Sequence, residues 1–478
     1  MYIFKSGTTS LKKNAVLNVF KQCSNIIFPL LTFPYISRVL GADNLGRYSF
    51  VDSLIQILVT VAVLGIPTYA VREGARIRND YKEIEQFSAE LFTISLFSML
   101  IVYFFLFVLL MYVPRIKSDS VLVVILSFNI LATVLGRDWI NSIYENYIYI
   151  TARQFLFQFV SLFTIFLVIR NQDDYIKYAA IMLISNSGGF ILNLLYLQKK
   201  IPLRITLRLH LKKHLKPIFL LFCSSLAITI YVKSDIFLIG LLSTNKEVGI
   251  YTLASKIYIV IKSVLNAIIL VVIPRAANLL GSGRFSEYYN ILSELKKILY
   301  TLIFPAIIGL FVLSKSIILL IGGKGFYLGY NPLRILSIAL FCAVFNCFYA
   351  QCVLVINRKE NIFFIATVIS SVVNIILNII LIPRFGASGA AFTTLVAEIV
   401  VLIICKFNAD RYLRLKKDKD MKSVFVGSII IALICILVNK IFSIDLLKII
   451  VSFIFSLVAY TIVLFLMKNS LFEKINNR

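Results

Sequence analysis

The chain has 478 residues, of which 60% are hydrophobic and only 15% are charged. Ordinary globular domains are about 45–50% apolar and about 25% charged, so this apolar excess cannot all be buried in a soluble core. The composition excludes a soluble enzyme and a secreted disulfide scaffold, and it predicts an all-α polytopic membrane protein.

Apolar stretches of about 20 residues, the length that crosses a hydrocarbon layer about 30 Å thick, recur along the whole chain. We predict about 14 transmembrane helices from them. Their expected positions are 14–39, 45–70, 87–112, 120–142, 155–169, 176–197, 217–242, 248–273, 298–322, 331–355, 362–383, 388–406, 423–439 and 446–467.

The net charge of +26 comes from 49 Lys and Arg against 23 Asp and Glu. In a soluble protein this balance would suggest a nucleic-acid partner, but here the charges fall in short loops between apolar stretches, so we expect no nucleic-acid binding. Alternate loops carry about 31 and about 10 positive residues, and the richer set includes both termini. The positive-inside rule therefore predicts a multi-pass membrane protein with both termini in the cytoplasm.

The chain carries a weak internal repeat. The segment LGRY at 45–48 opens the second span as VGIY at 248–251 opens the eighth. Six spans separate the two, so the copies share one orientation and predict two six-helix lobes about a pseudo-two-fold axis along the membrane normal. The expected divisions are an N-terminal lobe at 1–197, a basic linker at 198–216, a second lobe at 217–406, and a linker with two extra helices at 407–478.

Polar side chains recur at helical spacing inside several spans, where they should face protein or water because lipid would penalise them. Such stripes run along the first, second, seventh and eighth spans. Spans 3, 12 and 13 have almost no such stripe in their interiors, and we expect them to face lipid more fully. The stripes are Asn14, Asn18, Lys21 and Asn25; Ser49, Asp52, Gln56 and Thr60; Ser225, Thr229 and Lys233; Tyr251, Ser255, Tyr258 and Lys262.

Charged residues within these spans are the strongest functional signal. Each costs on the order of 2.5–3.5 kcal/mol near a helix centre. Lys21, Lys233, Lys256 and Lys262 outnumber the acidic Asp52 and Asp235. A surplus of cations predicts a cavity for an anionic ligand; internal neutralisation, including a pair between Lys233 and Asp52, is the alternative.

Several other kinds of site are not expected. The chain has only two histidines, His210 and His214, in a basic loop, so neither a metal site nor a cofactor is predicted. It lacks a phosphate-binding loop for ATP, and its outer loops look too short for a catalytic domain, so we expect a protein that is not an enzyme.

Specific segments resemble a known family. PLLTFPYISRVLG at 29–41, GRYSF at 46–50 and LGIPTYAVRE at 64–73 resemble the N-terminal signature of Wzx-type O-antigen and polysaccharide flippases. Weaker matches follow in family order at 235–240, 248–257, 273–275 and 384–391.

This resemblance implies the fold of the multidrug/oligosaccharidyl-lipid/polysaccharide exporter superfamily. It also implies translocation of undecaprenyl-diphosphate-linked oligosaccharide repeat units across the bacterial inner (plasma) membrane by alternating access, for O-antigen, capsule or exopolysaccharide synthesis. H+ or Na+ would be the coupling ion, and a polysaccharide polymerase and chain-length regulator would be partners.

With this substrate, lysine and arginine would hold the diphosphate and polar side chains would meet the sugars. The candidate substrate-binding residues are Lys21, Asn25, Arg38, Arg47, Lys233, Lys256, Lys262, Arg72 and Arg275. Asp52 and Asp235 are the candidate ion-coupling residues. Two alternatives stay open: a cation-coupled drug exporter of the same superfamily, and a membrane glycan polymerase or assembly scaffold.

Overall fold

A computed structural model describes residues 11–207, 210–413 and 420–470, with the side chains of residues 11–27 and 212 outside that description. Over the described residues the chain forms helices joined by short loops, with no strand among them. The all-α prediction is therefore confirmed. The chain divides into two compact units, Met1–Leu241 and Leu242–Arg478, which we call unit 1 and unit 2.

The predicted number of spans agrees with the helices. Among the described residues, eleven helices are long and apolar enough to cross a membrane, and α5 (Ser120–Gly136) is a shorter apolar helix. The long helices α1 (Leu11–Val63) and α13 (Glu360–Ala409) each contain a glycine with non-helical backbone angles. Counting each of them as two segments and adding α5 gives about 14 spans, as the sequence predicts.

Each of these two kinks depends on one glycine. Gly41 in α1 has φ 73° and Gly386 in α13 has φ 53°, the left-handed region in which a side chain costs about 1–2 kcal/mol. After the second kink, the backbone N–H of Ala387 donates to Glu247 Oε2 at 2.7 Å. The carboxylate satisfies an amide that the kink leaves without a helical partner, so the helix can restart at once.

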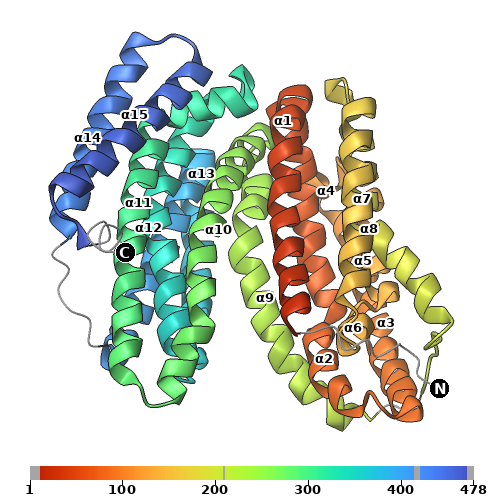
Figure 1. The fold of residues 1–478 in the computed structure, drawn as a ribbon. Helices are drawn as coiled ribbons and strands as arrows, with labels where there is room; N and C mark the ends of the chain where they lie inside the picture. The colour runs from red at the N-terminus through yellow and green to blue at the C-terminus, as the bar shows by residue number, and fades with distance from the viewer. Residues whose placement is uncertain (1–10, 208–209, 414–419, 471–478) are drawn as a thin grey trace. The chain divides into compact units, whose positions relative to one another are not determined.

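Unit 1 consists of α1 to α9 (Figure 1). Asp80 caps α3, because its side chain accepts from the backbone N–H groups of Lys82 and Glu83. Besides α1 and α5, its helices are α2 (Ile66–Ile77), α3 (Tyr81–Tyr112), α4 (Pro114–Lys117), α6 (Trp139–Ile143), α7 (Tyr147–Val168), the 3₁₀ turn η1 (Gln172–Asp174), α8 (Tyr175–Gln198) and α9 (Leu211–Leu242).

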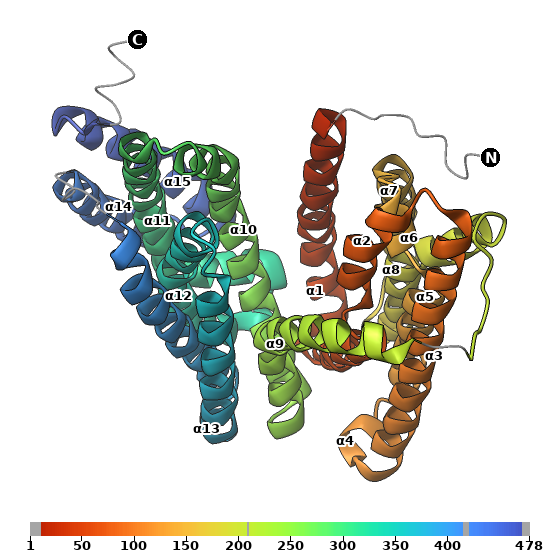
Figure 2. The ribbon, with the colours of Figure 1, turned by 90° about the horizontal axis from the view of Figure 1, so that it is seen from below.

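Unit 2 is built around α12 (Tyr330–Cys347), which lies among α10, α11 and α13 in Figure 2. In the helical stretch Lys324–Val355, which contains α12, 72% of the most apolar segment of 18 residues is buried. The other elements are α10 (Asn245–Gly281), α11 (Phe285–Gly322), η2 (Lys324–Gly329), the π-helix η3 (Phe348–Val355), η4 (Asp410–Tyr412), α14 (Met421–Ile441) and α15 (Asp445–Leu466).

The last two helices, α14 and α15, form a hairpin that packs on α11. Leu313 of α11 shares an apolar cluster with Ile431 and Tyr460. At one end of the hairpin, Lys297 Nζ lies 3.1 Å from Asp420 Oδ2, and Ser470 donates to the same carboxylate. Burial opposes ionisation of Asp420, but the bonds from Ser470 and Lys297 outweigh it and lower the pKa of this carboxyl below its ordinary value.

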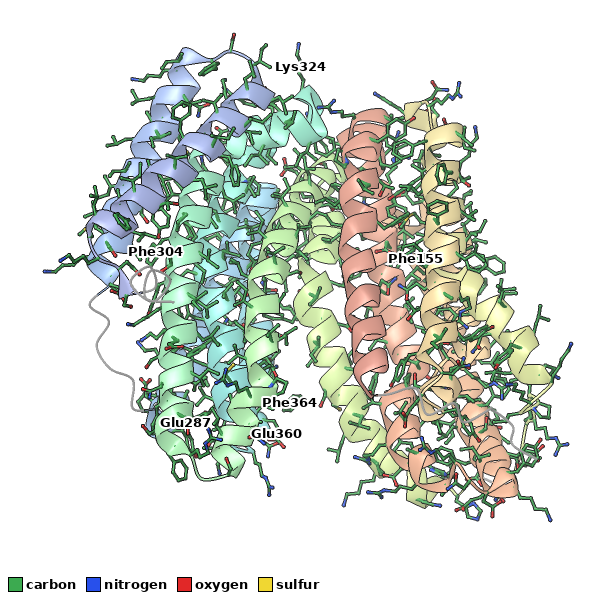
Figure 3. The ribbon with its side chains drawn as sticks, viewed as in Figure 1. Phe155, Glu287, Phe304, Lys324, Glu360 and Phe364 are labelled. Atoms are coloured by element: carbon green, nitrogen blue, oxygen red, sulfur yellow. The ribbon has the colours of Figure 1, made fainter. Side chains whose placement is uncertain are left out.

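Loops that the sequence assigns to opposite sides lie at opposite ends of unit 2. Figure 3 shows Glu287 and Glu360 together at one end and Lys324 at the other. Glu287 and Glu360 begin helices that follow positively charged loops, whereas Lys324 follows the glycine turn at 322–323. The alternation of sides is as predicted for this unit; which end faces the cytoplasm remains a prediction.

Candidate substrate and ion sites

Two of the predicted polar stripes meet in unit 1. Asp52, Gln56 and Thr60 follow one another at four-residue intervals on α1, and Thr229 and Lys233 do so on α9. The hydroxyls of Thr60 and Thr229 lie 3.1 Å apart. Two turns away on α1 and one turn away on α9, Lys233 Nζ lies 3.4 Å from Asp52 Oδ2. The two stripes therefore form one continuous polar contact, here called the unit 1 pair after its charged members Asp52 and Lys233.

The unit 1 pair keeps part of its surface accessible. The side chain of Lys233 is 30% exposed and that of Asp52 is 21% exposed. Gln56 Nε2 also donates to Asp52, at 3.4 Å. The contact neutralises both charges while leaving the ammonium group within reach of another anion.

Unit 2 holds a tighter arrangement around Glu398 on α13. Its Oε1 accepts from Lys262 Nζ at 2.8 Å and from the Tyr258 hydroxyl at 3.1 Å, both on α10. Its Oε2 accepts from Asn346 Nδ2 of α12 at 2.6 Å. Glu398 is 3% exposed, so its charge is compensated inside the bundle by Lys262. We call Lys262 and Glu398 the unit 2 pair.

The polar face of α10 contacts the second half of α13 at a further point. The hydroxyls of Tyr251 and Thr394 lie 3.0 Å apart, one helical turn from Glu398. The sequence predicts that this span faces lipid, and that prediction is wrong for the face that carries Thr394 and Glu398. Glu398 is the one acidic residue in the span at 388–406, and it could have indicated that this face is buried, because an acid facing lipid is costly.

The two predicted arginines near the end of the first span do not join the unit 1 pair. Arg47 is held by Asp43 at 3.2 Å and by Asp119 at 3.7 Å. Burial raises the pKa of Asp119, which precedes α5, and Arg47 only partly offsets this. Arg38 is exposed.

The remaining predicted residues are scattered. Arg72 contacts Glu73 at 2.9 Å and is half exposed, and Arg275 is exposed. Lys256 is half-buried, and Asp235 is buried with 6% of its surface exposed. The side chains of Lys21 and Asn25 lie outside the described residues.

The described part of the chain contains no group of three or more His, Cys, Asp or Glu side chains that could hold a metal ion. The charged pairs themselves can accept a proton or exchange partners. An incoming anion can compete with Asp52 or Glu398 for a lysine, and each carboxylate released in this way becomes a site for a cation.

Comparisons with known proteins agree with the sequence segments. The model of a family described as polysaccharide biosynthesis protein matches residues 11–280. A relative from Escherichia coli (strain K12), "Putative O-antigen transporter", is 23% identical over 397 residues, which is 82% of this chain and 95% of that protein.

Solved structures share the fold at low identity. The lipid II flippase MurJ in an inward closed conformation superposes with a TM-score of 0.77 at 15% identity, covering 97% of this chain and 99% of that one. An inward-facing multidrug resistance MATE family transporter of the MOP superfamily gives 0.59 at 15% identity, covering 83% and 98%.

Fold and charged pairs together define a polytopic α-helical membrane protein with compensated charges inside its bundles. Since the family model matches more than half of the residues, the chain belongs to the polysaccharide biosynthesis protein family. The resemblance to Wzx-type flippases is thereby confirmed.

Proposed function

We propose that this protein is a flippase that moves an undecaprenyl-diphosphate-linked oligosaccharide across the bacterial inner membrane by alternating access. The family, the name of its Escherichia coli relative and the MurJ-like fold support this proposal. The protein would work without enzymatic chemistry of its own, coupled to H+ or Na+ and alongside a polymerase and a chain-length regulator.

One structural observation carries the proposal. In each unit a lysine within a transmembrane helix, Lys233 or Lys262, is bonded to a carboxylate within another such helix and is still 30% or 26% exposed. A diphosphate offers several charged oxygens, so it can replace the single carboxylate without leaving the ammonium unpaired. Neighbouring hydroxyl and amide groups, such as Thr229 and Gln56 in unit 1, suit the sugar hydroxyls.

The test is movement of a fluorescent undecaprenyl-diphosphate oligosaccharide between leaflets of proteoliposomes. We expect Lys233→Ala and Lys262→Ala each to slow movement at least about tenfold, because each loses a charge-assisted hydrogen bond. Lys448→Ala is the matched control: Lys448 lies 3.6 Å from Asp445 on its own helix, away from both pairs, and we expect a rate near wild type.

The possible outcomes distinguish an error in the proposed site from an error in the proposed function. Movement that survives both substitutions would contradict the two lysines as the anion site while keeping the flippase. No movement with wild type, under an imposed H+ or Na+ gradient, would contradict the flippase itself.

The second candidate is a cation-coupled exporter of small organic cations. The buried Glu398 beside the Tyr258 ring is the observation that favours it, since carboxylates and aromatic rings bind such cations. Proton-driven efflux of ethidium from vesicles, lost in Glu398→Gln, would support this candidate over the first.

A further inference from the structure

The two histidines of the chain meet on one buried carboxylate in unit 1. Glu90 of α3 is 3% exposed. Its Oε1 lies 3.0 Å from His210 Nδ1 and its Oε2 lies 2.7 Å from His214 Nε2. Gln86 Nε2 also donates to Oε1, at 2.9 Å. Neither charged pair described above includes any of these residues.

The hydrogen bonds of His214 continue to a third helix. Its Nδ1 lies 2.8 Å from the hydroxyl of Tyr69 on α2. Because a carboxylate only accepts, Nε2 of His214 must carry a proton and donate to Glu90. In the neutral ring, Nδ1 then accepts from Tyr69; in the protonated ring, Nδ1 donates to the same oxygen. His214 can therefore gain or lose a proton without losing a hydrogen bond.

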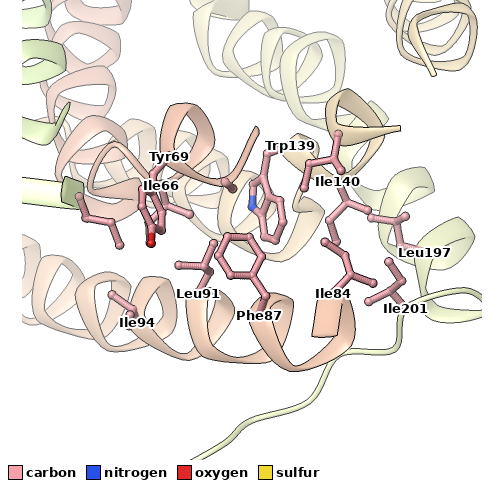
Figure 4. Packing of buried hydrophobic residues seen from close by; sticks show 13 residues of the cluster. Ile66, Tyr69, Ile84, Phe87, Leu91, Ile94, Trp139, Ile140, Leu197 and Ile201 are labelled. Atoms are coloured by element: carbon pink, nitrogen blue, oxygen red, sulfur yellow. The ribbon is translucent and has the colours of Figure 1, made fainter. Parts of the chain in front are cut away.

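Aromatic side chains pack against the buried His214, whereas the side chain of His210 is 63% exposed. Figure 4 shows Tyr69, Phe87 and Leu91 packed together, with Trp139 on the far side of Phe87. The ring of His214 lies edge-on to Tyr69, with centroids 5.7 Å apart, and the residue is 1% exposed. In such surroundings charges are screened weakly, so a positively charged partner strongly stabilises a carboxylate.

The charged groups around the cluster come from every element that packs on it. They are Arg72 and Glu73 on α2, Glu85 on α3, Arg204 of the linker, Arg137 and Asp138 ahead of α6, and Lys213 on α9. Arg204 and Glu85 form an ion pair at 2.8 Å. Arg137 is bonded to Ser88 and the Ile201 carbonyl, and Asp138 to Arg153. Each of these groups has a partner or faces outward, so His214 and His210 are the cations that contact Glu90 among the described residues.

We propose that Glu90, His214 and His210 form a proton-binding site that fastens the start of α9, and the linker before it, to α2 and α3. When His214 is neutral, Oε2 of the charged Glu90 carboxylate accepts a hydrogen bond from an uncharged ring. Protonation turns this charge-assisted bond into an ion pair, which is stronger because two opposite charges then attract in surroundings that screen them weakly. The attachment is therefore firmest at low pH and weakens as rising pH removes the proton.

The site lies at the start of a long helix, so binding of a proton there affects how that helix is held. Helix α9 begins at Leu211, beside the site, and carries Lys233 about 28 Å beyond His214. It ends at Leu242, where the chain passes from unit 1 into unit 2. The proton thus controls how firmly one end of this connecting helix is held, whatever the protein transports.

The first test follows the histidines directly. Because the chain has two of them, ¹⁵N-histidine spectra of the full protein in nanodiscs, with a histidine-free tag, can be assigned with His210→Gln alone. Between about pH 5 and pH 9, the His214 signals should change with pH, and Glu90→Gln should alter that pH dependence because it removes the charged partner. Wild-type His214 signals that stay constant over this range would overturn the proposal without any variant.

The second test measures the attachment. Hydrogen exchange of the segment around 205–220, corrected for the intrinsic rate, should be about fivefold slower at pH 6 than at pH 8 in wild type. His214→Gln should abolish this difference. The matched control is Arg204→Gln, which removes the ion pair with Glu85 and should speed exchange equally at both values. A pH difference that persists undiminished in His214→Gln would contradict the site.

Discussion

Single residues decide how this protein carries charge inside its helices. The sequence predicts an excess of lysine in the spans, and the structure pairs Lys233 with Asp52 and Lys262 with Glu398. Asp52 is among the candidates that the sequence offers, whereas Glu398 is not, because its span has no polar stripe. The region around these lysines is therefore less cationic than the sequence alone indicates, because Lys233 and Lys262 are each paired with a carboxylate.

A prediction at this scale concerns the unit 2 pair. Glu398→Gln leaves Lys262 without its anion, and breaking a buried pair costs about 3–5 kcal/mol. We expect the free energy of unfolding to fall by about 3 kcal/mol, since Lys262 is partly exposed. Denaturant titration of the purified protein in detergent measures this change.

The control replaces both partners. Lys262→Met with Glu398→Gln removes the buried charge and should recover most of the lost stability. A double variant as unstable as Glu398→Gln would show that the carboxylate acts through Asn346 and Tyr258 rather than through the lysine.

At the scale of elements, the helix boundaries follow from local chemistry at a few positions. The turns that the sequence expects near 39–45 and 383–388 are glycine kinks inside continuous helices, Gly41 and Gly386. Propensity and hydropathy locate such breaks to within a few residues. They do not reveal that the second segment restarts at once, because this needs Glu247, 140 residues away, to satisfy the Ala387 amide.

Glycine substitutions test this account. Gly386→Ala should destabilise the protein by about 1–2 kcal/mol, because φ is positive there and the added Cβ would meet the Glu247 carboxylate. Gly309→Ala in α11 is the matched control: nothing lies within 4 Å of its Cβ, and alanine favours a helix by about 1 kcal/mol over glycine. Thermal unfolding of the two variants compares them, and equal losses would contradict the kink.

For the whole molecule, the alternation of positively charged loops predicts the orientation in the membrane. In unit 2, Lys324 lies at the end opposite Glu287 and Glu360 (Figure 3). The positive-inside rule then assigns Glu287 to the cytoplasmic side together with both termini.

Cysteine labelling measures this orientation. In a background without the native cysteines, Lys324→Cys should react with a membrane-impermeant maleimide in intact spheroplasts. Glu287→Cys lies at the start of α11, whose other end at Gly322 directly precedes Lys324, and it should react only after permeabilisation. The reverse pattern would invert the predicted topology, and labelling of both in intact spheroplasts would contradict a membrane-spanning α11.

The sequence by itself determined the class of protein, because the amount of apolar surface and the length of each stretch are properties of composition that no folding can change. It also determined the number of spans, the family and the stripes on α1 and α9, since helical spacing places such residues on one face before any packing occurs. Only the tertiary structure decided which charges are compensated. Glu398 meets Lys262 across 136 residues, and Glu90 meets His214 across 124. Such pairs depend on which helix faces which, and local periodicity carries no information about that choice.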